Sequence, residues 1–216
     1  MKFRFTLLLL SLLAVRSFAQ QGPENFFGPT MQLTGTYAGA NMAPLLFDMD
    51  GDGDLDVIRQ AWGTSDLVWH RNDDGLWSGE IVFLQNLPNL HRAELHDFNA
   101  DGLQDLGLLT YDEHRLYVSY GLPGGGFGIP NPVTGSFSQS IDFAAGDFDG
   151  DGDLDMFEID RGYNEVVAYE NEGNAFSPNP ILIDNLIRPT FAECADLDGD
   201  GKDELLVSPF DNVDQG

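Results

Sequence analysis

The sequence predicts an all-β protein built from β-propeller-type repeats, each a four-stranded antiparallel blade with a period of about 50 residues. Three observations lead to this fold class. An acidic stretch recurs four times at a nearly constant interval, each interval holds about four short apolar or aromatic segments between turn residues, and no segment has helical periodicity. The 25 glycines and 11 prolines suit a chain that turns often.

Residues 1–19 have the pattern of a secretory signal peptide. Lys2 and Arg4 precede an apolar run, and Ser17 and Ala19 are the small residues that signal peptidase requires, so we expect cleavage after Ala19. The alternative is a membrane anchor, which is disfavoured because an apolar run of about eleven residues is too short to span a bilayer. The sequence therefore predicts a secreted or cell-surface protein.

The expected mature chain, residues 20–216, is strongly acidic. The whole chain has a formal charge of −26, and removal of the three basic residues of the signal peptide lowers it to −29. So negative a chain is a poor partner for nucleic acid or anionic membranes and a good partner for cations. Its only cysteine, Cys194, excludes an internal disulfide, which leaves bound metal as the expected stabilising element of a secreted protein.

The four acidic stretches mark an internal repeat. They read DMDGDGDLD, DFNADGLQD, DFDGDGDLD and DLDGDGKDE, and they occupy residues 48–56, 97–105, 147–155 and 196–204. The intervals between their first residues are 49, 50 and 49. The first three are followed by an apolar-aromatic segment, a turn and a further aromatic residue, at 67–77, 116–127 and 166–176. A two-sheet sandwich also uses short strands, but it does not explain self-similarity at a fixed spacing.

Neither end of the chain completes a blade. Residues 26–37 match the outer part of a repeat without its beginning, and the chain stops one strand after the fourth acidic stretch. Because propellers usually need at least four blades to close, we expect an N-terminal fragment of a larger propeller, in which 26–37 completes the last blade. The alternatives are an open array of repeats and closure by association with another chain.

Each acidic stretch has oxygen-bearing side chains at its positions 1, 3, 5 and 9 and a glycine at position 6. A short loop wraps around a hard cation in this way, because alternate side chains point inward, the glycine permits a sharp turn and the carbonyl of position 7 adds an oxygen. Six or seven oxygens at flexible geometry favour Ca²⁺ over Mg²⁺. We therefore expect up to four Ca²⁺ sites, one in each loop.

The predicted ligands occupy positions 1, 3, 5, 7 and 9 of each loop, where position 7 offers its backbone carbonyl. They are Asp48, Asp50, Asp52, Asp54 and Asp56 in the first loop; Asp97, Asn99, Asp101, Leu103 and Asp105 in the second; Asp147, Asp149, Asp151, Asp153 and Asp155 in the third; and Asp196, Asp198, Asp200, Lys202 and Glu204 in the fourth. The carboxylate of Asp54 is expected to turn outward. Asn99 and Glu204 predict weaker binding in their loops.

Two other interpretations of the acidic stretches need to be weighed. An EF-hand begins with the same pattern, but it has flanking helices and a glutamate at position 12. Position 12 here is Arg59, Leu108, Glu158 or Val207, and the residues after position 9 have the character of strands. Acidic turns that bind nothing are the second alternative, against which stands the fourfold recurrence of one ligand order with its glycine.

The stretches GDFDGDGDLDMF and ADLDGDGKDELLV resemble the FG-GAP/VCBS repeat, the calcium-binding blade of integrin-α-like propellers. VWHRNDDGLW is similar to the strand-turn-aromatic segment of bacterial members, and the resemblance covers about residues 26–216. It implies a propeller of about seven blades with Ca²⁺ in the loops described above. The second loop departs from the motif at Asn99 and Gln104 and the fourth at Glu204, which implies lower affinity rather than another family.

Other candidate residues favour packing over chemistry. The four histidines have no zinc spacing, and Cys194 falls at the apolar position that Leu46, Leu95 and Ala145 occupy in the other repeats. Three tryptophans of the first repeat can stack on sugar rings, but blade packing is the expected role of Trp62, Trp69 and Trp77.

The sequence thus favours a secreted, calcium-stabilised propeller that binds or adheres to an extracellular protein or carbohydrate without catalysis. We expect no nucleic-acid partner and no transmembrane span after signal cleavage. The alternative is the propeller portion of a secreted polysaccharide-active enzyme, a lyase or hydrolase, whose catalytic residues lie outside this chain. A third possibility is a structural module beside another domain.

Overall fold

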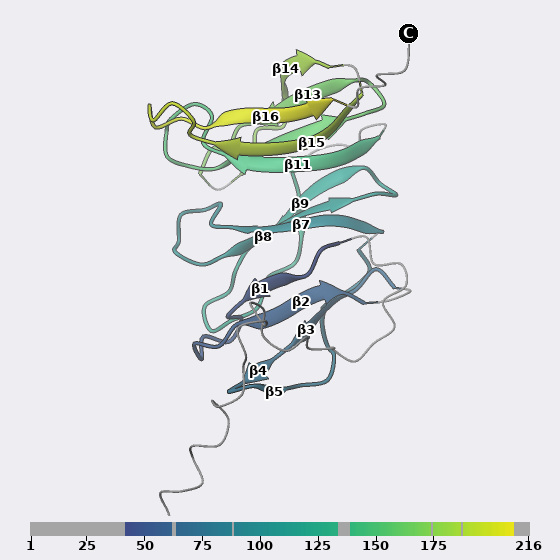
Figure 1. Cartoon of the computed structure of the whole chain (residues 1–216), viewed down its shortest axis with the longest axis vertical. Coiled ribbons are helices and arrows are strands. Elements are labelled where there is room, and N and C mark those ends of the chain that lie inside the picture. Colours follow the sequence, from purple (N-terminus) through teal and green to yellow (C-terminus); the bar gives the residue numbers. More distant parts are fainter. Residues whose placement is uncertain are drawn as a thin grey trace, which may run out of the picture. The chain divides into compact units, whose positions relative to one another are not determined.

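The computed structural model describes residues 42–61, 64–87, 89–133, 139–173, 175–186 and 188–209. The expected signal peptide, the expected early strand at 26–37 and Trp62 lie outside these residues. The chain divides into two compact units, residues 1–35 and 36–216, and everything described here belongs to the second. Among the described residues, all regular elements are β-strands (Figure 1). The described residues hold no helix able to cross a membrane.

Three four-stranded antiparallel sheets follow one another along the chain. Blade 1 has the order β1 (Leu45–Phe47), β2 (Asp56–Gln60), β3 (Leu67–His70), β6 (Ile81–Leu84). Blade 2 consists of β7 (Leu90–His96), β8 (Asp105–Thr110), β9 (Arg115–Ser119) and β10 (Asn131–Pro132), and blade 3 of β11 (Ser140–Gly146), β12 (Asp155–Asp160), β13 (Glu165–Tyr169) and β14 (Ile181–Asn185). Blade 4 is represented by the pair β15 (Pro189–Ala195) and β16 (Glu204–Pro209). The prediction of repeated four-stranded antiparallel blades is confirmed.

Each acidic loop connects the first and second strands of its blade with the same register. The residue at position 9 pairs with the residue just before position 1, in the pairs Phe47↔Asp56, His96↔Asp105, Gly146↔Asp155 and Ala195↔Glu204. Because the register is constant, the four loops occupy equivalent ends of their blades, on the left in Figure 1.

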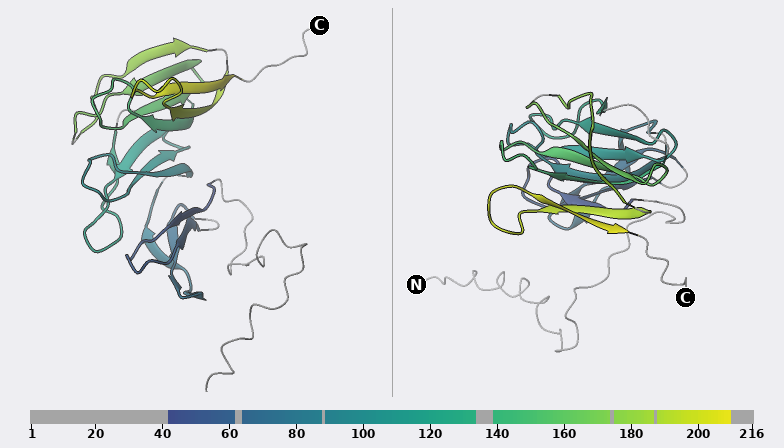
Figure 2. Two further views of the ribbon diagram at one scale, coloured as in Figure 1. Left: turned by 60° about the vertical axis from the view of Figure 1, so that its left-hand side comes forward. Right: turned by 90° about the horizontal axis from the view of Figure 1, so that it is seen from above.

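Successive blades pack face to face through three apolar clusters, in the order of the chain (Figures 1 and 2). The first cluster joins blades 1 and 2, the second joins blades 2 and 3, and the third joins blades 3 and 4. Since blades 2 and 3 each have a neighbouring blade on both faces, their second strands β8 and β12 are buried at every residue. This explains why their sequences do not alternate between apolar and polar residues.

A hairpin follows the third strand of blade 1, as the strand-turn-aromatic pattern predicts. β4 (Asn72–Asp73) and β5 (Leu76–Trp77) pair across Asp74 and Gly75, whose φ angles of 51° and 84° are those of a type I′ turn. The bridges Gly121↔Phe127 and Asn171↔Phe176 occupy the same place in blades 2 and 3. The aromatic residue that closes the hairpin therefore recurs, as expected.

The hairpin of one blade packs against the acidic loop of the blade before it. Phe127 of blade 2 shares the first apolar cluster with Met49, at position 2 of the first loop. Phe176 of blade 3 meets Phe98, at position 2 of the second loop, with their ring centroids 5.8 Å apart. Leu197, at position 2 of the fourth loop, is 63% exposed, since no described blade follows blade 4.

The prediction that Cys194 and its counterparts fall at an apolar core position is correct for three repeats and wrong for the first. Leu95, Ala145 and Cys194 pack against the first, second and third clusters, each facing the preceding blade. No described blade precedes blade 1, and Leu46 is accordingly 62% exposed. This sequence position determines on which face of the blade the side chain lies, and the side chain is buried only where that face packs against another blade.

Phe98→Ala is expected to lower the free energy of unfolding by about 3–5 kcal/mol, because it empties a buried site between two blades. Phe98 is 1% exposed and contacts the rings of His96 and Phe176. Urea unfolding measures the change. The control is Tyr163→Ala, since Tyr163 is 61% exposed, and it should alter stability by less than about 0.5 kcal/mol. Equal losses in the two variants would contradict the packing described here.

Candidate metal centre

The carboxylate at position 1 closes each acidic loop by accepting hydrogen bonds from the loop's own backbone. Asp48 accepts from the amides of Gly51 at 2.8 Å, Asp52 at 3.1 Å and Gly53 at 2.9 Å. The bond from the amide at position 6 recurs in the other three loops, where Asp97, Asp147 and Asp196 accept from Gly102 at 2.8 Å, Gly152 at 3.0 Å and Gly201 at 3.1 Å. One carboxylate thus reverses the chain in every repeat.

Glycine at position 6 is required by the backbone conformation. The φ angles of Gly53, Gly102, Gly152 and Gly201 are 97°, 85°, 98° and 92°, in the left-handed region that only glycine adopts without strain. Position 4 is also left-handed, and in the second loop it is Ala100 with a φ of 55°. The prediction of a sharp turn at position 6 is confirmed.

Position 5 in all four loops, and position 3 in the second, third and fourth, use one side-chain oxygen to hold the backbone. At position 5, the Oδ1 atoms of Asp52, Asp101, Asp151 and Asp200 accept from the amide at position 7 at 2.9, 2.8, 3.1 and 2.9 Å. At position 3, the Oδ1 atoms of Asn99, Asp149 and Asp198 accept from the amide at position 5 at 3.1, 3.1 and 3.0 Å. The loop is therefore folded by its own side chains, each of which has a second polar atom for another partner.

Position 9 has a structural role that the sequence did not reveal. The Asp56 carboxylate is buried and accepts two backbone hydrogen bonds, from Met49 at position 2 and from Asn72 in the hairpin, at 2.9 and 2.8 Å. Asp105 does the same with Phe98 and Gly121 at 2.9 and 2.7 Å, and Asp155 with Phe148 and Asn171 at 3.2 and 2.8 Å. In the fourth loop Glu204 accepts from Leu197 at 2.7 Å. This residue ties the loop to the rest of its blade.

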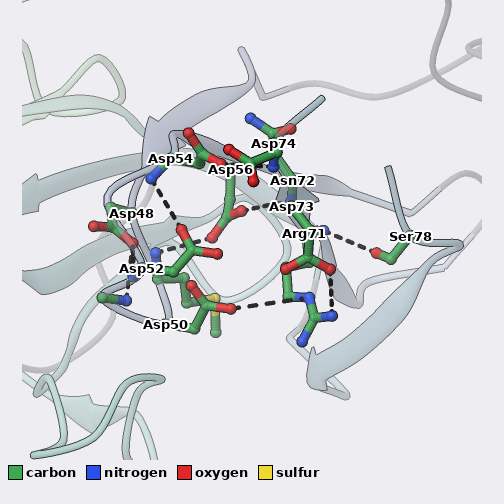
Figure 3. Close-up of polar contacts among 12 residues, drawn as sticks. Asp48, Asp50, Asp52, Asp54, Asp56, Arg71, Asn72, Asp73, Asp74 and Ser78 are labelled. Atoms are coloured by element: carbon green, nitrogen blue, oxygen red, sulfur yellow. Dashed lines mark hydrogen bonds and ion pairs between the residues drawn. The ribbon is translucent and has the colours of Figure 1, made fainter. Parts of the chain in front are cut away.

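Three of the loops bring carboxylates close enough to hold a metal ion. Oxygen atoms within 4.8 Å of one another come from Asp48, Asp50 and Asp56, from Asp147, Asp149 and Asp155, and from Asp196, Asp198 and Glu204. Figure 3 shows the first of these groups at the centre of its loop. The position-5 residues Asp151 and Asp200 do not join the groups of their loops.

The second loop forms no such group among the described residues. Asn99 takes the place of the carboxylate at position 3, and its amide nitrogen donates to the carboxylate of Asp101 at 3.0 Å. The loop keeps its backbone hydrogen bonds but carries less negative charge. The expectation that this loop differs from the others thus has a structural basis.

Two of the acidic loops hold a buried carboxylate oxygen that suits a hard cation. The Oδ1 atom of Asp50, in the first group, and the Oδ1 atom of Asp153, beside the third-loop group, accept no hydrogen bond from a described residue. Burial, together with the charges of Asp52 and Asp56, raises the pKa of Asp50. Burial also raises the pKa of Asp153 and of Asp155 to about 6. A divalent cation would remove this cost of holding like charges together, because it favours the ionised carboxylates.

Two residues beside the first loop were missed by sequence reasoning. Asp73, in the hairpin, forms a further close group with Asp50 and Asp52, and it also pairs with Arg71 (Figure 3). The Nε atom of Arg71 lies 3.9 Å from a carboxylate oxygen of Asp50. The corresponding residues of the next repeats are Leu122 and Glu172 in place of Asp73. Recurrence therefore offered no signal for this position.

The side chain at position 7 makes contacts outside its own loop in the first and fourth repeats. The carboxylate of Asp54 accepts from the amide of Asp74 in the hairpin at 2.7 Å and does not join the group of its loop. Lys202 reaches across to the third loop, where its ammonium donates to the carbonyl of Asp149. That the carbonyls of Asp54, Leu103, Asp153 and Lys202 bind an ion stays a prediction.

The structure places Glu158, the position-12 glutamate, away from the loops. It is fully buried within blade 3, where its carboxylate accepts hydrogen bonds from the hydroxyl groups of Ser140 and of Tyr169, the latter at 2.8 Å. No described histidine or cysteine joins a group of metal-binding side chains. Burial raises the pKa of the Cys194 thiol to about 12, which disfavours a reactive thiolate.

Comparison with known families identifies the repeat. The model of the FG-GAP-like repeat matches residues 97–158 and 147–207, which together make up just over half of the chain. Each match begins at position 1 of an acidic loop and ends within the second strand of the next blade. One match therefore contains two acidic loops and the packing between them. No curated protein matches the chain.

Glu158→Gln is expected to remove a pH dependence from folding stability. Burial raises the pKa of Glu158 to about 7, so the folded protein retains this proton above pH 4.5, where the unfolded chain loses it. Wild-type stability should therefore fall by about 1–3 kcal/mol as the pH rises from 5 to 8. The variant should lack this fall, measured by urea unfolding in excess Ca²⁺.

The matched control for this experiment is Glu172→Gln, since Glu172 is exposed. It should keep the wild-type dependence on pH. A Glu158→Gln protein that loses stability with rising pH as steeply as the wild type would contradict the assignment of this dependence to Glu158.

Proposed function

This chain belongs to the FG-GAP-like repeat family, and on that premise we propose that it is a secreted β-propeller protein that binds Ca²⁺ in its acidic loops and serves as a non-catalytic scaffold for an extracellular protein or carbohydrate. The observation that carries the proposal is the convergence of carboxylates in loops that are already folded by their own hydrogen bonds.

Calcium is the cation that these loops fit best. Every side-chain donor is an oxygen, and such loops can surround an ion with six or seven oxygens in irregular geometry, which favours Ca²⁺ over the strictly octahedral Mg²⁺. Asp48, Asp50 and Asp56 would hold the ion in the first loop, with Asp52 completing the site beside them. The bound ion would supply positive charge, and the protein would supply a loop whose backbone is fixed before the ion arrives.

The four sites should differ in strength. The first loop has Asp73 as an additional carboxylate, whereas the nearby guanidinium of Arg71 offsets part of its negative charge. The third loop has the full set of aspartates. The second loop has Asn99 in place of a charged ligand, and the fourth has the longer Glu204. Because affinity rises with the number of charged ligands, binding should be weakest in the second loop.

A scaffold without catalysis is supported by the surroundings of two potentially reactive groups, a thiol and a buried carboxylate. The Cys194 thiol has a pKa raised to about 12, and the buried carboxylate of Glu158 is bound by two hydroxyl groups. The predicted signal peptide supports secretion, and extracellular Ca²⁺ is abundant enough for the weak sites typical of extracellular modules, with dissociation constants of about 10⁻⁴–10⁻³ M.

Calcium should raise the melting temperature of the purified chain, because binding to the folded state alone stabilises it. At 10 mM Ca²⁺, each site of the affinity given above contributes about 1.4–2.7 kcal/mol. Two or more sites should raise the melting temperature by about 5 °C or more relative to the protein in chelator. Scanning calorimetry measures the shift. Identical melting in calcium and in chelator would refute calcium binding.

Asp149→Asn should weaken calcium binding without unfolding the third loop. Asparagine retains the Oδ1 atom that accepts from the Asp151 amide, just as Asn99 does from Asp101 in the second loop. It removes one charged ligand, so we expect the affinity of this site to fall by about tenfold. Calorimetric titration with Ca²⁺ measures the change.

The control for that titration is Asp112→Asn, since Asp112 is an exposed residue of the turn between β8 and β9. It should bind Ca²⁺ as the wild type does. Both variants should melt like the wild type in chelator. An unaltered calcium titration for Asp149→Asn would contradict the assignment of this residue as a ligand.

A further inference from the structure

A second feature of the molecule lies at the ends of the blades away from the acidic loops. It is a hollow of about 730 Å³ whose lining includes His91, Tyr111, Gln139, Arg161, Arg188 and Thr190. Tyr111 and Arg161 begin the turns after the second strands of blades 2 and 3, while His91 and Thr190 lie at the starts of β7 and β15. The acidic loops connect these same strands at their opposite ends.

The charge of this hollow is opposite to that of the chain. The described residues of its lining include two arginines and a histidine but no Asp or Glu, although Asp and Glu number 36 in the chain and Lys and Arg only 10. Four other arginines pair with carboxylates, in the pairs Arg59–Glu80, Arg71–Asp73, Arg92–Asp142 and Arg115–Glu113. The structure gives the guanidinium of Arg161 no hydrogen bond or ion pair with a described residue. An anion is the missing partner that this arrangement fits.

An aromatic ring stands beside these charges. The Tyr111 side chain is 43% exposed, and its ring is held by the rings of His91 and His114, with centroid separations of 5.8 and 5.3 Å. A fixed, exposed aromatic ring offers a flat apolar surface next to polar groups, here the amide of Gln139 and the hydroxyl of Thr190. This combination suits a sugar ring, which has an apolar face and a rim of hydroxyl groups.

A neighbouring hollow also contains an arginine, Arg92. The guanidinium of Arg92 already pairs with Glu94 and Asp142, and all three residues line the wall of that hollow. Its positive charge is therefore neutralised within the protein. Arg161 is the arginine that retains its charge for a ligand.

We propose that the hollow beside Tyr111 binds an acidic saccharide, one whose sugar rings carry carboxylates. Arg161 takes the carboxylate, since the planar guanidinium matches its geometry, and Tyr111 takes the face of a sugar ring. This inference deepens the proposed scaffold function, on which it rests, by naming the chemical class of its ligand. The ligand would sit at the end of the blades opposite to the calcium loops.

Calorimetric titration of the full chain in excess Ca²⁺ tests the site, with trigalacturonate as the probe and neutral galactotriose as the comparison. Trigalacturonate should bind at least tenfold more tightly than galactotriose. Arg161→Ala should weaken trigalacturonate binding by tenfold or more, and Arg161→Lys, which keeps the charge but loses the planar fork, should weaken it less. The control Arg115→Ala should stay within twofold of the wild type.

The proposal would be overturned by no binding of trigalacturonate, by equal binding of galactotriose, or by unchanged affinity of the Arg161→Ala protein. A hexaglutamate peptide that binds more tightly than trigalacturonate would also overturn it, because the site would then be one for acidic peptides.

The same samples separate this inference from the proposed function. If calcium raises the melting temperature but trigalacturonate does not bind, the saccharide site is refuted and the calcium-binding scaffold stands. If calcium does not change the melting temperature, the proposal of calcium binding is refuted, whether or not trigalacturonate binds. Size analysis of trigalacturonate after incubation gives the third readout, since a shortened probe would refute the absence of catalysis.

Discussion

Every repeat of this protein depends on one hydrogen bond, from the glycine amide at position 6 of the acidic loop to the carboxylate at position 1. The bond occurs in all four loops at 2.8–3.1 Å. It reverses the chain between the first two strands of a blade, and it fixes the backbone from which positions 3, 5 and 9 extend. The carboxylates converge because the loop is closed. They then repel one another, and a bound cation would remove this unfavourable interaction.

The same loops also join the blades. The buried residue at position 2, Met49 or Phe98, packs under the hairpin of the next blade, and the carboxylate at position 9 holds that residue's amide. Asn171 extends the connection, since its side-chain amide donates to the carbonyls of Phe98 and Leu154 at 2.7 and 3.0 Å. An ion bound in a loop would therefore act on the packing between blades as well as on the loop.

Features that recur in the sequence were the ones that could be predicted. The blades, the glycine at position 6 and the converging positions 1, 3 and 9 each leave a signal at a spacing of about 50 residues. Asp73 and Arg161 leave none, because each belongs to a single repeat and acquires its surroundings only when neighbouring elements pack. The exposure of Leu46 was mispredicted for a related reason. A repeated sequence pattern predicts the environment of a blade that has a neighbouring blade on both faces, whereas blade 1 lacks one described neighbour.

The central claim is that the folded acidic loops bind Ca²⁺ through their converging carboxylates. A crystal structure determined with Ca²⁺ present, using the anomalous signal of the ion, tests it most directly. We expect an anomalous peak among Asp48, Asp50 and Asp56 and another among Asp147, Asp149 and Asp155, with the hydrogen bonds of position 1 unchanged. Loops that keep these hydrogen bonds but show no ion at saturating Ca²⁺ would contradict it.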